Sequence, residues 1–158
     1  MFNMDSSAIS IRRALAADVT ALETVREASW PMIDGVPLLQ HLEASGTFTY
    51  LAEDDSPFGF VTVGSCETGL ADGEILEWFL LQSHQERTLG RRLLVHGLSV
   101  LKRRLCENAF IWVPVEATRA REVLLRQEFE DSGACRERNT STGVISETGF
   151  RKDLSDFF

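Results

Sequence analysis

The chain has 158 residues, 44% of them hydrophobic and 25% charged, with 16 Lys plus Arg against 24 Asp plus Glu and a net charge of −8. This length and apolar content exclude a disordered chain and fit a single domain over residues 1–158. The negative charge excludes bulk binding to nucleic acid or to an anionic membrane, and it suits a basic or amine-bearing partner.

The cysteines and the N-terminal residues indicate a cytoplasmic protein. Cys66, Cys106 and Cys135 are odd in number and form no CxxC pair, so we expect neither a disulfide framework nor a zinc site. His41 and His96 have no partner at metal-ligand spacing, so no metal is expected. No signal-peptide pattern is visible, and no apolar run approaches the roughly 18 residues of a membrane span.

The hydrophobic patterns predict strands that precede and alternate with helices. In the first half we expect a strand at 9–12, a helix from an Asp18 N-cap to Trp30, a helix at 36–45, and a hairpin of strands at 47–53 and 58–64. In the second half we expect a strand at 74–81, a helix at 90–106, a strand at 109–115, a helix at 118–127 capped by Thr118, and strands near 133–138 and 143–154. This order indicates a mixed α/β or α+β fold.

The segment that joins the strand at 74–81 to its helix carries the clearest chemical signal. Arg87, Arg91 and Arg92 lie close together there in a strongly negative chain. A strand-to-helix turn directs unpaired N–H groups and the helix dipole toward an anion, and guanidinium groups donate in pairs to phosphate oxygens. The segment therefore predicts a phosphate site; the alternative is a set of solvated arginines paired with carboxylates. No GxxxxGK[ST] or GxGxxG motif is present.

The order of elements and four short stretches resemble the GNAT N-acetyltransferases. These stretches are the opening strand and helix from Ile11 to Asp18, the hairpin from Tyr50 to Val61, Gln85-x-x-Thr88-x-Gly90 in place of the signature [QR]-x-x-G-x-[GA], and the closing strand Phe150-Arg151-Lys152-Asp153-Leu154. The resemblance implies a GNAT-like fold, in which about four helices flank a mostly antiparallel sheet with one parallel, splayed strand pair. It also implies acetyl-CoA as co-substrate and direct acetyl transfer to a primary amine in a ternary complex.

The resemblance places the coenzyme between the splayed strands, with its pyrophosphate on the loop that follows. The implied coenzyme-binding residues are Phe79, Leu80, Leu81, Gln85, Glu86, Arg87, Thr88, Leu89, Gly90, Arg91 and Arg92. Thr88 replaces the first glycine of the signature and crowds the approach to the phosphates, while Glu86 adds a negative charge. We expect weakened but retained coenzyme binding.

Glu74 and Glu77 are the candidate general bases. Transfer to an amine needs a group that accepts the amine proton, and carboxylates on an otherwise apolar strand are expected to have raised pKa values. In a regular strand their spacing puts them on opposite faces, so only one would face the site, although a bulge would change that parity. The alternatives are a solvated strand end for Glu74 and a salt bridge for Glu77.

The general acid and the acceptor are not identified by the sequence. Many GNAT proteins carry a tyrosine in a helical pattern like NxxAxxLYxxxGF; here Leu124 stands at the tyrosine position and Glu128 at the glycine position. The resemblance implies that Trp30 and Met32 floor the acceptor pocket. The acceptor would be a small-molecule amine or a protein amino group. If the protein forms a homodimer, the C-terminal edge strands are the elements that would pair across its interface.

Two other functions on the same fold stay open. A catalytically weakened sensor of acyl-CoA is motivated by Leu124 and Thr88, because neither supplies what the family pattern supplies at those positions. An interaction module that has lost its ligand is the third reading, since a fold does not by itself imply a function. The acyl-chain length and the oligomeric state also stay open.

Overall fold

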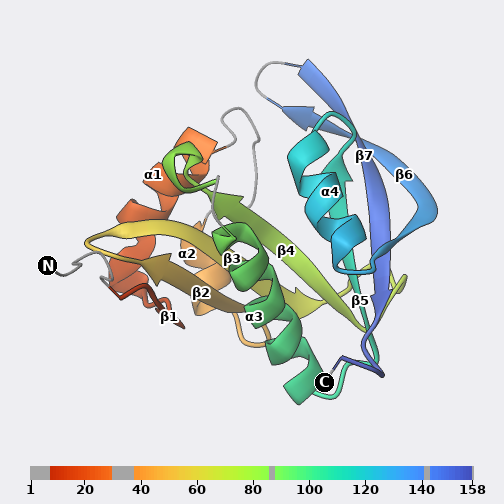
Figure 1. Ribbon diagram of the computed structural model, residues 1–158, viewed down its shortest axis with the longest axis horizontal. Coiled ribbons are helices and arrows are strands. Elements are labelled where there is room, and N and C mark those ends of the chain that lie inside the picture. The colour runs from red at the N-terminus through yellow and green to blue at the C-terminus, as the bar shows by residue number, and fades with distance from the viewer. Residues whose placement is uncertain (1–7, 30–37, 86–87, 141–142, 158) are drawn as a thin grey trace, which may run out of the picture.

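The computed structural model describes residues 8–29, 38–85, 88–140 and 143–157, and over these ranges its strands form one seven-stranded sheet in the order β1-β2-β3-β4-β5-β7-β6 (Figure 1). The strands are β1 (Ser10–Arg13), β2 (Phe48–Glu53), β3 (Pro57–Ser65), β4 (Gly73–Leu80), β5 (Asn108–Pro114), β6 (Glu130–Thr140) and β7 (Gly143–Asp153). The helices are α1 (Val19–Ser29), α2 (Leu38–Glu43), α3 (Leu89–Arg103) and α4 (Thr118–Arg126), with short 3₁₀ helices η2 (Ala16–Asp18) and η3 (Gln82–His84). None of these described helices is long and apolar enough to cross a membrane.

Strand β3 is apolar on both faces because helices cover it from both sides. Phe60 packs in a buried cluster with residues of α1 and α2, whereas Val61 and Val63 pack in a second cluster with α3. Gly97 of α3 allows the closest approach, since a Cβ at that position would lie 3.1 Å from side-chain atoms of both valines. A continuous apolar run is the expected pattern for a strand buried on both faces.

Strands β4 and β5 form the parallel pair of the sheet and separate after three residue pairs. They pair at Gly73–Ala109, Glu74–Phe110 and Ile75–Ile111 only, whereas β4 stays paired with β3 as far as Leu80. Figure 1 shows the two strands meeting at one end and diverging toward the other. The predicted fold class, a mostly antiparallel mixed sheet with one splayed parallel pair, is confirmed.

The two predicted helix caps are wrong. Leu15 is the N-cap of η2, and its backbone N–H donates to Oδ2 of Asp18 at 2.8 Å, so Asp18 lies inside the first turn. Arg12 holds the other carboxylate oxygen of Asp18 at 2.9 Å, and this ion pair draws the side chain back toward β1. The N-cap of α4 is Ala117 rather than Thr118, and it makes no side-chain capping bond.

Helices α3 and α4 both end at a non-glycine residue in the left-handed region. Leu105 has φ 70° and Glu128 has φ 67°. After α4, the N–H of Phe129 donates to the carbonyl of Leu124, and the N–H of Glu128 donates to the carbonyl of Leu125, each at 3.0 Å. This is the Schellman pattern, which normally has glycine where Glu128 stands. The same turn explains why α3 ends at Arg103, before the predicted end.

Candidate functional site

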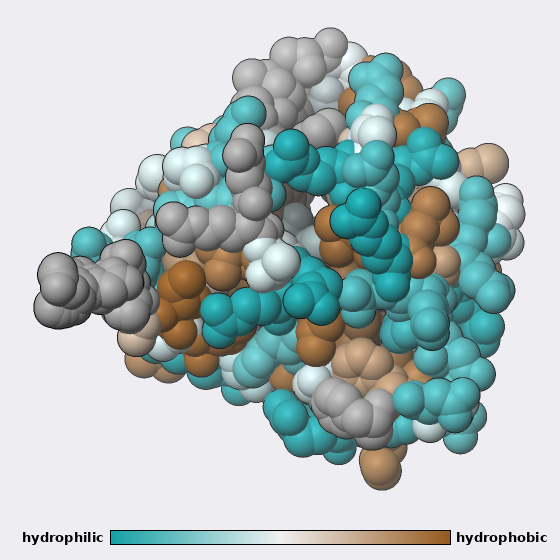
Figure 2. Space-filling view, viewed as in Figure 1, coloured by the Kyte–Doolittle hydropathy of each residue, from teal (hydrophilic) through white to brown (hydrophobic). Residues whose placement is uncertain are grey.

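The separation of β4 from β5 opens two adjoining cavities. The first, of about 370 Å³, lies between the strands and is called the strand cavity; Glu77, Trp112 and Arg138 are among its lining residues. The second, of about 620 Å³, lies between the start of α3 and α4 and is called the helix cavity. Trp78, Leu80, Gln85, Arg119 and Ala120 line both. Figure 2 shows this face hollowed between the part that carries α3 and the part that carries α4, with hydrophilic residues at the rim.

Glu77 places a buried carboxylate in the wall of the strand cavity. Arg26 of α1 donates to its Oε2 at 2.6 Å, whereas its Oε1 is buried without a hydrogen-bond partner among the described residues. Burial raises the pKa of this carboxyl, and the charge of Arg26 opposes that rise. An oriented carboxylate with a raised pKa, and with one oxygen that has no hydrogen-bond partner among the described residues, is suited to accept a proton.

A bulge at Leu76 brings the two predicted bases, Glu74 and Glu77, to the same face of β4. The register of β3 and β4 shifts between the pairs Thr62–Glu77 and Val63–Ile75, so Leu76 is the additional residue. Ile75 faces α3, and both Glu74 and Glu77 therefore point to the other face, although a regular strand would separate them. The opposite-face prediction is wrong for this reason. Glu74 does not line the strand cavity; it lies near Cys66 and Arg136, and burial raises its pKa.

Two polar residues beside Glu77 were not found from the sequence. His41 of α2 places its Nε2 3.8 Å from Oε1 of Glu77, and burial together with the charge of Arg26 lowers the pKa of this histidine. Ser29, the last residue of α1, lines the strand cavity, and its hydroxyl is buried without a partner among the described residues. A single histidine and a single serine at helix ends give no pattern that would distinguish them from structural residues.

The β6–β7 hairpin contributes a second charged wall to the strand cavity. The carboxylate of Glu147, with a side chain only 1% exposed, accepts from Nε of Arg136 at 2.6 Å and from Nη2 of Arg138 at 3.1 Å. The guanidinium of Arg136 also lies over the ring of Trp112, 4.4 Å from its centroid. Arg138 and Glu147 line the cavity, and Arg136 does not. Sequence reasoning missed this cluster because alternating charges are common in solvated strands.

Among the implied coenzyme residues, the structure places Thr88, Gly90 and Arg91 together at the helix cavity. Thr88 is the N-cap of α3 and makes no side-chain capping bond; the first backbone bond of the turn is from Arg92 N–H to the Thr88 carbonyl. An α-helix leaves its first N–H groups without intrahelical acceptors, so the groups from Thr88 to Arg91 are available here. The indole of Trp78 fixes this turn by donating to the carbonyl of Gly90 at 3.0 Å.

The remaining implied coenzyme residues, and the two residues predicted for the acceptor pocket, lie in different places. Phe79, Leu80 and Gln85 line the strand cavity, and the side chain of Gln85 donates to the carbonyl of Leu80 at 2.9 Å. Leu89 is buried in the core, whereas Arg92 is exposed and lines neither cavity. Leu81 packs beside both core clusters. Glu86, Arg87, Trp30 and Met32 lie outside the described residues.

Helix α4 adds two arginines to the helix cavity that the sequence did not single out. Arg119 and Arg126 line it together with Arg91, against a single carboxylate, Glu122. Arg119 also donates to the carbonyl of Gln85 at 3.1 Å, which joins α4 to the loop after β4. A cavity with three guanidinium groups and a helix N-terminus fits the phosphates of a coenzyme A thioester.

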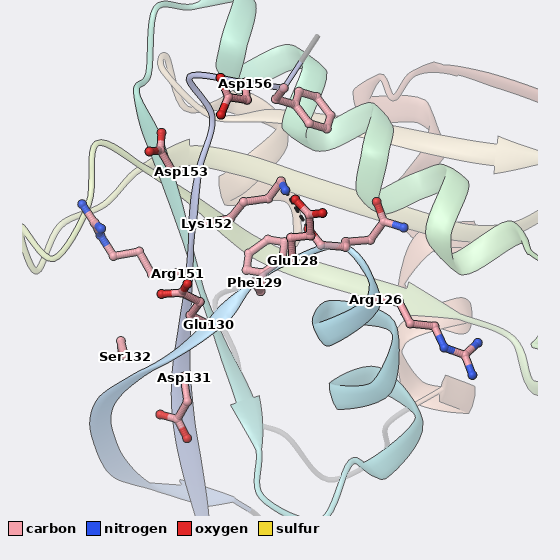
Figure 3. A pocket seen from close by; sticks show the side chains of 12 residues that line it. Arg126, Glu128, Phe129, Glu130, Asp131, Ser132, Arg151, Lys152, Asp153 and Asp156 are labelled. Atoms are coloured by element: carbon pink, nitrogen blue, oxygen red, sulfur yellow. Dashed lines mark hydrogen bonds between the residues drawn. The ribbon is translucent and has the colours of Figure 1, made fainter.

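A larger cavity, of about 1050 Å³, adjoins the helix cavity at the end of α4, where Arg126 and Gln127 line both (Figure 3). Acidic and basic side chains from β6 and β7 line it, and none of the predicted catalytic or coenzyme residues does. The amine of Lys152, directed to the end of α4 in Figure 3, donates to the carbonyl of Gln127 at 2.6 Å. This cavity is therefore a surface depression around a structural lysine.

Across the described residues no group of three or more His, Cys, Asp or Glu is arranged to hold a metal ion.

Comparison with known families decides the family to which this site belongs. The model of the acetyltransferase (GNAT) family matches residues 16–129, which include α1, the splayed strands, α3 and α4. The chain belongs to the GNAT acetyltransferase family. It is accordingly an acyltransferase. No curated protein matches the sequence.

Solved structures share the GNAT fold with this chain at low sequence identity. NAA60 from Arabidopsis thaliana, in complex with a bisubstrate analogue, is 14% identical with a TM-score of 0.80 over 94% of this chain and 100% of that one. The ribosomal-protein-S18-alanine N-acetyltransferase from Escherichia coli is 14% identical with a TM-score of 0.79, covering 94% of this chain and 95% of its own. The yncA protein from Salmonella typhimurium, with acetyl-CoA, is 17% identical with a TM-score of 0.74 over 94% and 95%. At these identities the likeness establishes the fold.

Proposed function

We propose that this GNAT protein transfers an acetyl group from acetyl-CoA to a primary amine, with Glu77 as the general base. The observation that carries the proposal is the Glu77 carboxylate, which lines the strand cavity with one oxygen bound to Arg26 and the other without a partner among the described residues. A buried acceptor of this kind gains a hydrogen bond when an amine enters the cavity.

The coenzyme is proposed to bind along both cavities. Its phosphates would lie in the helix cavity, against the first N–H groups of α3 and the guanidinium groups of Arg91, Arg119 and Arg126. Its pantetheine arm would lie against the exposed edge of β4, where β5 no longer pairs after Ile75. Acetyl-CoA in the solved structures of NAA60 and of the Salmonella protein supports this choice of co-substrate.

Transfer requires that the amine arrive neutral or lose a proton at the site. The amine nitrogen forms a bond to the acetyl carbonyl carbon, the bond from that carbon to sulfur breaks, and the sulfur leaves with the electron pair. Glu77 accepts the amine proton, and the leaving thiolate takes a proton from a donor or from water. The position of Glu77, between the open edge of β4 and helices α1 and α2, allows the first of these steps.

The proton donor for the leaving thiolate is not the residue at the usual family position. Leu124 stands there, and its side chain is fully buried in the core and lines neither cavity. This observation favours the second candidate function, a sensor that binds acyl-CoA with slow turnover. Under that reading Glu77 and Arg26 would be a structural ion pair.

An acetylation assay separates the enzyme from the sensor. The protein is incubated with acetyl-CoA and a panel of primary amines, and the released thiol and the mass of each product are measured. We expect at least one acetylated amine and a turnover that depends on Glu77. Acetyl-CoA binding without turnover over the whole panel would favour the sensor, and absence of both would contradict the proposed function.

A further inference from the structure

The strand cavity offers complementary groups to a ligand that carries both an amine and a carboxylate. On its α1 side, Oε1 of Glu77 and the hydroxyl of Ser29 are buried acceptors without partners among the described residues. On its β6–β7 side, Arg138 presents a guanidinium whose hydrogen bonds within the described part of the chain all go to Glu147. The α1 side of the cavity thus carries acceptor atoms without a hydrogen-bond donor, and the β6–β7 side carries guanidinium N–H groups that can donate to a ligand.

Arg138 is the less strongly held of the two cations that share Glu147. Arg136 approaches the carboxylate to 2.6 Å and packs over Trp112, whereas Arg138 approaches it to 3.1 Å through Nη2 and to 3.4 Å through Nε. Glu74 also faces this cluster, and its main cationic neighbour is again Arg136. Two guanidinium groups thus share one fully buried carboxylate, and Arg138 is the one that lines the cavity.

The two walls are close enough to act on one small molecule. Glu77 and Arg138 both line the same cavity. The strand cavity, at about 370 Å³, is near the lower end of the range of about 300–1,000 Å³ for small-molecule sites. The end of the pantetheine arm and the acetyl group would fill the part of this volume along β4, and the part between Glu77 and Arg138 would hold a small acceptor.

We infer that the acceptor is a small amine that carries a carboxylate, of the α-amino acid class, with its nitrogen at Glu77 and its carboxylate at Arg138. This inference rests on the proposed function and names the substrate class of the same site. The product is the N-acetylated acid: the nitrogen–carbonyl carbon bond forms, the carbon–sulfur bond breaks, and the amine proton goes to Glu77. Bidentate pairing with a carboxylate is the geometry to which a guanidinium is best suited.

Matched acceptors test this assignment. The probes are the L-α-amino acids found in proteins, the carboxamides of the same amino acids, and short peptides with a free amino terminus. We expect the best free amino acid to exceed its carboxamide in kcat/KM by about tenfold or more, as the loss of one charged hydrogen-bonding partner requires. A second readout is titration of the same pairs into protein saturated with coenzyme A, where the acid should bind more tightly than the amide.

Variants of the two arginines separate recognition from structure. Arg138→Gln should reduce the ratio of acid to amide to about one, and Arg138→Lys should keep part of it, because a charge remains. The control is Arg136→Gln, which also loses a partner of Glu147 but does not line the cavity, and it should keep the ratio. Equal loss of acid and amide turnover in Arg138→Gln and Arg136→Gln would mean that Arg138 only supports the hairpin.

The outcomes distinguish this inference from the function on which it rests. Acetylation of carboxamides or peptides with a kcat/KM equal to or above that of the acids would overturn the inference and leave the N-acetyltransferase intact. Failure to bind acetyl-CoA or to acetylate any amine would overturn both.

Discussion

Arg26 of α1 binds one oxygen of Glu77 at 2.6 Å and leaves the other oxygen without a hydrogen bond among the described residues. The arginine orients the carboxylate and opposes the effect of burial on its pKa, so that a base can persist at a buried position. The same contact joins α1 to β4, and the two residues lie 51 positions apart in the chain. The candidate base is therefore positioned by tertiary structure.

Substitution of the two candidate bases should separate their roles. We expect Glu77→Gln to lower kcat about 100-fold or more with little change in acetyl-CoA affinity, because general-base catalysis typically contributes a factor of about 10² to 10⁴. Glu74→Gln is the matched control, since it lies on the same face but not at the cavity, and kcat should change by less than about threefold. Initial rates and coenzyme titrations on both variants check this. Equal losses in the two variants would remove Glu77 from its assigned role.

The pH dependence of turnover should depend on Arg26. The base form of Glu77 exists above its pKa, so kcat falls as the pH drops through a pKa that burial has raised. The charge of Arg26 lowers that pKa, and Arg26→Gln should therefore move the acidic limb of the kcat profile to higher pH. Arg12→Gln removes a guanidinium from an ion pair with Asp18 and Glu53 and is the control. A limb that stays in place in Arg26→Gln would show that another group controls it.

Adjacent arginines at the start of α3 should differ in coenzyme binding. Both arginines are exposed, but Arg91 lines the helix cavity and Arg92 does not. We expect Arg91→Ala to weaken acetyl-CoA binding by about 1.5–3 kcal/mol, the range for a hydrogen bond to a charged group, and Arg92→Ala to change it by less than about 0.5 kcal/mol. Titration calorimetry on both variants measures the difference. The reverse order would place the phosphates elsewhere on the loop.

Glu128, in the turn that follows α4, should lower the stability of the protein. Glu128 has φ 67° at a position where a Schellman turn normally carries glycine. Glu128→Gly removes the strain of a side chain in the left-handed region but adds freedom to the unfolded chain, and we expect a net gain of about 0.5–1 kcal/mol in the free energy of unfolding. Urea denaturation measures this. Glu130→Gly, in β6, should instead destabilise, since a glycine in a strand weakens it.

The order of elements was predictable from the sequence because apolar periodicity and turn residues are local signals. The hairpin of β2 and β3, the helix after β4 and the final two strands all form near their expected positions. The family motifs also located the start of α3, where Thr88, Gly90 and Arg91 meet the helix cavity. These features depend on neighbours in the sequence.

The features that the sequence did not predict depend on contacts between residues that are far apart in the chain. The ion pair with Arg12 takes Asp18 away from the cap, and the bulge at Leu76 brings Glu74 and Glu77 to one face. Nothing local marks His41 or Arg138, because each reaches the site from an element far along the chain. The acceptor side of the site is therefore the part that required the three-dimensional structure.

Titration of acetyl-CoA into the purified protein, with desulfo-coenzyme A as a second ligand, tests the central claim most directly. The account predicts binding of both ligands with a 1:1 stoichiometry and a Kd in the micromolar range, about −8 kcal/mol, despite Thr88 at the glycine position. No heat and no thermal shift at millimolar ligand would contradict it, because the cleft between β4 and β5 would then hold no coenzyme.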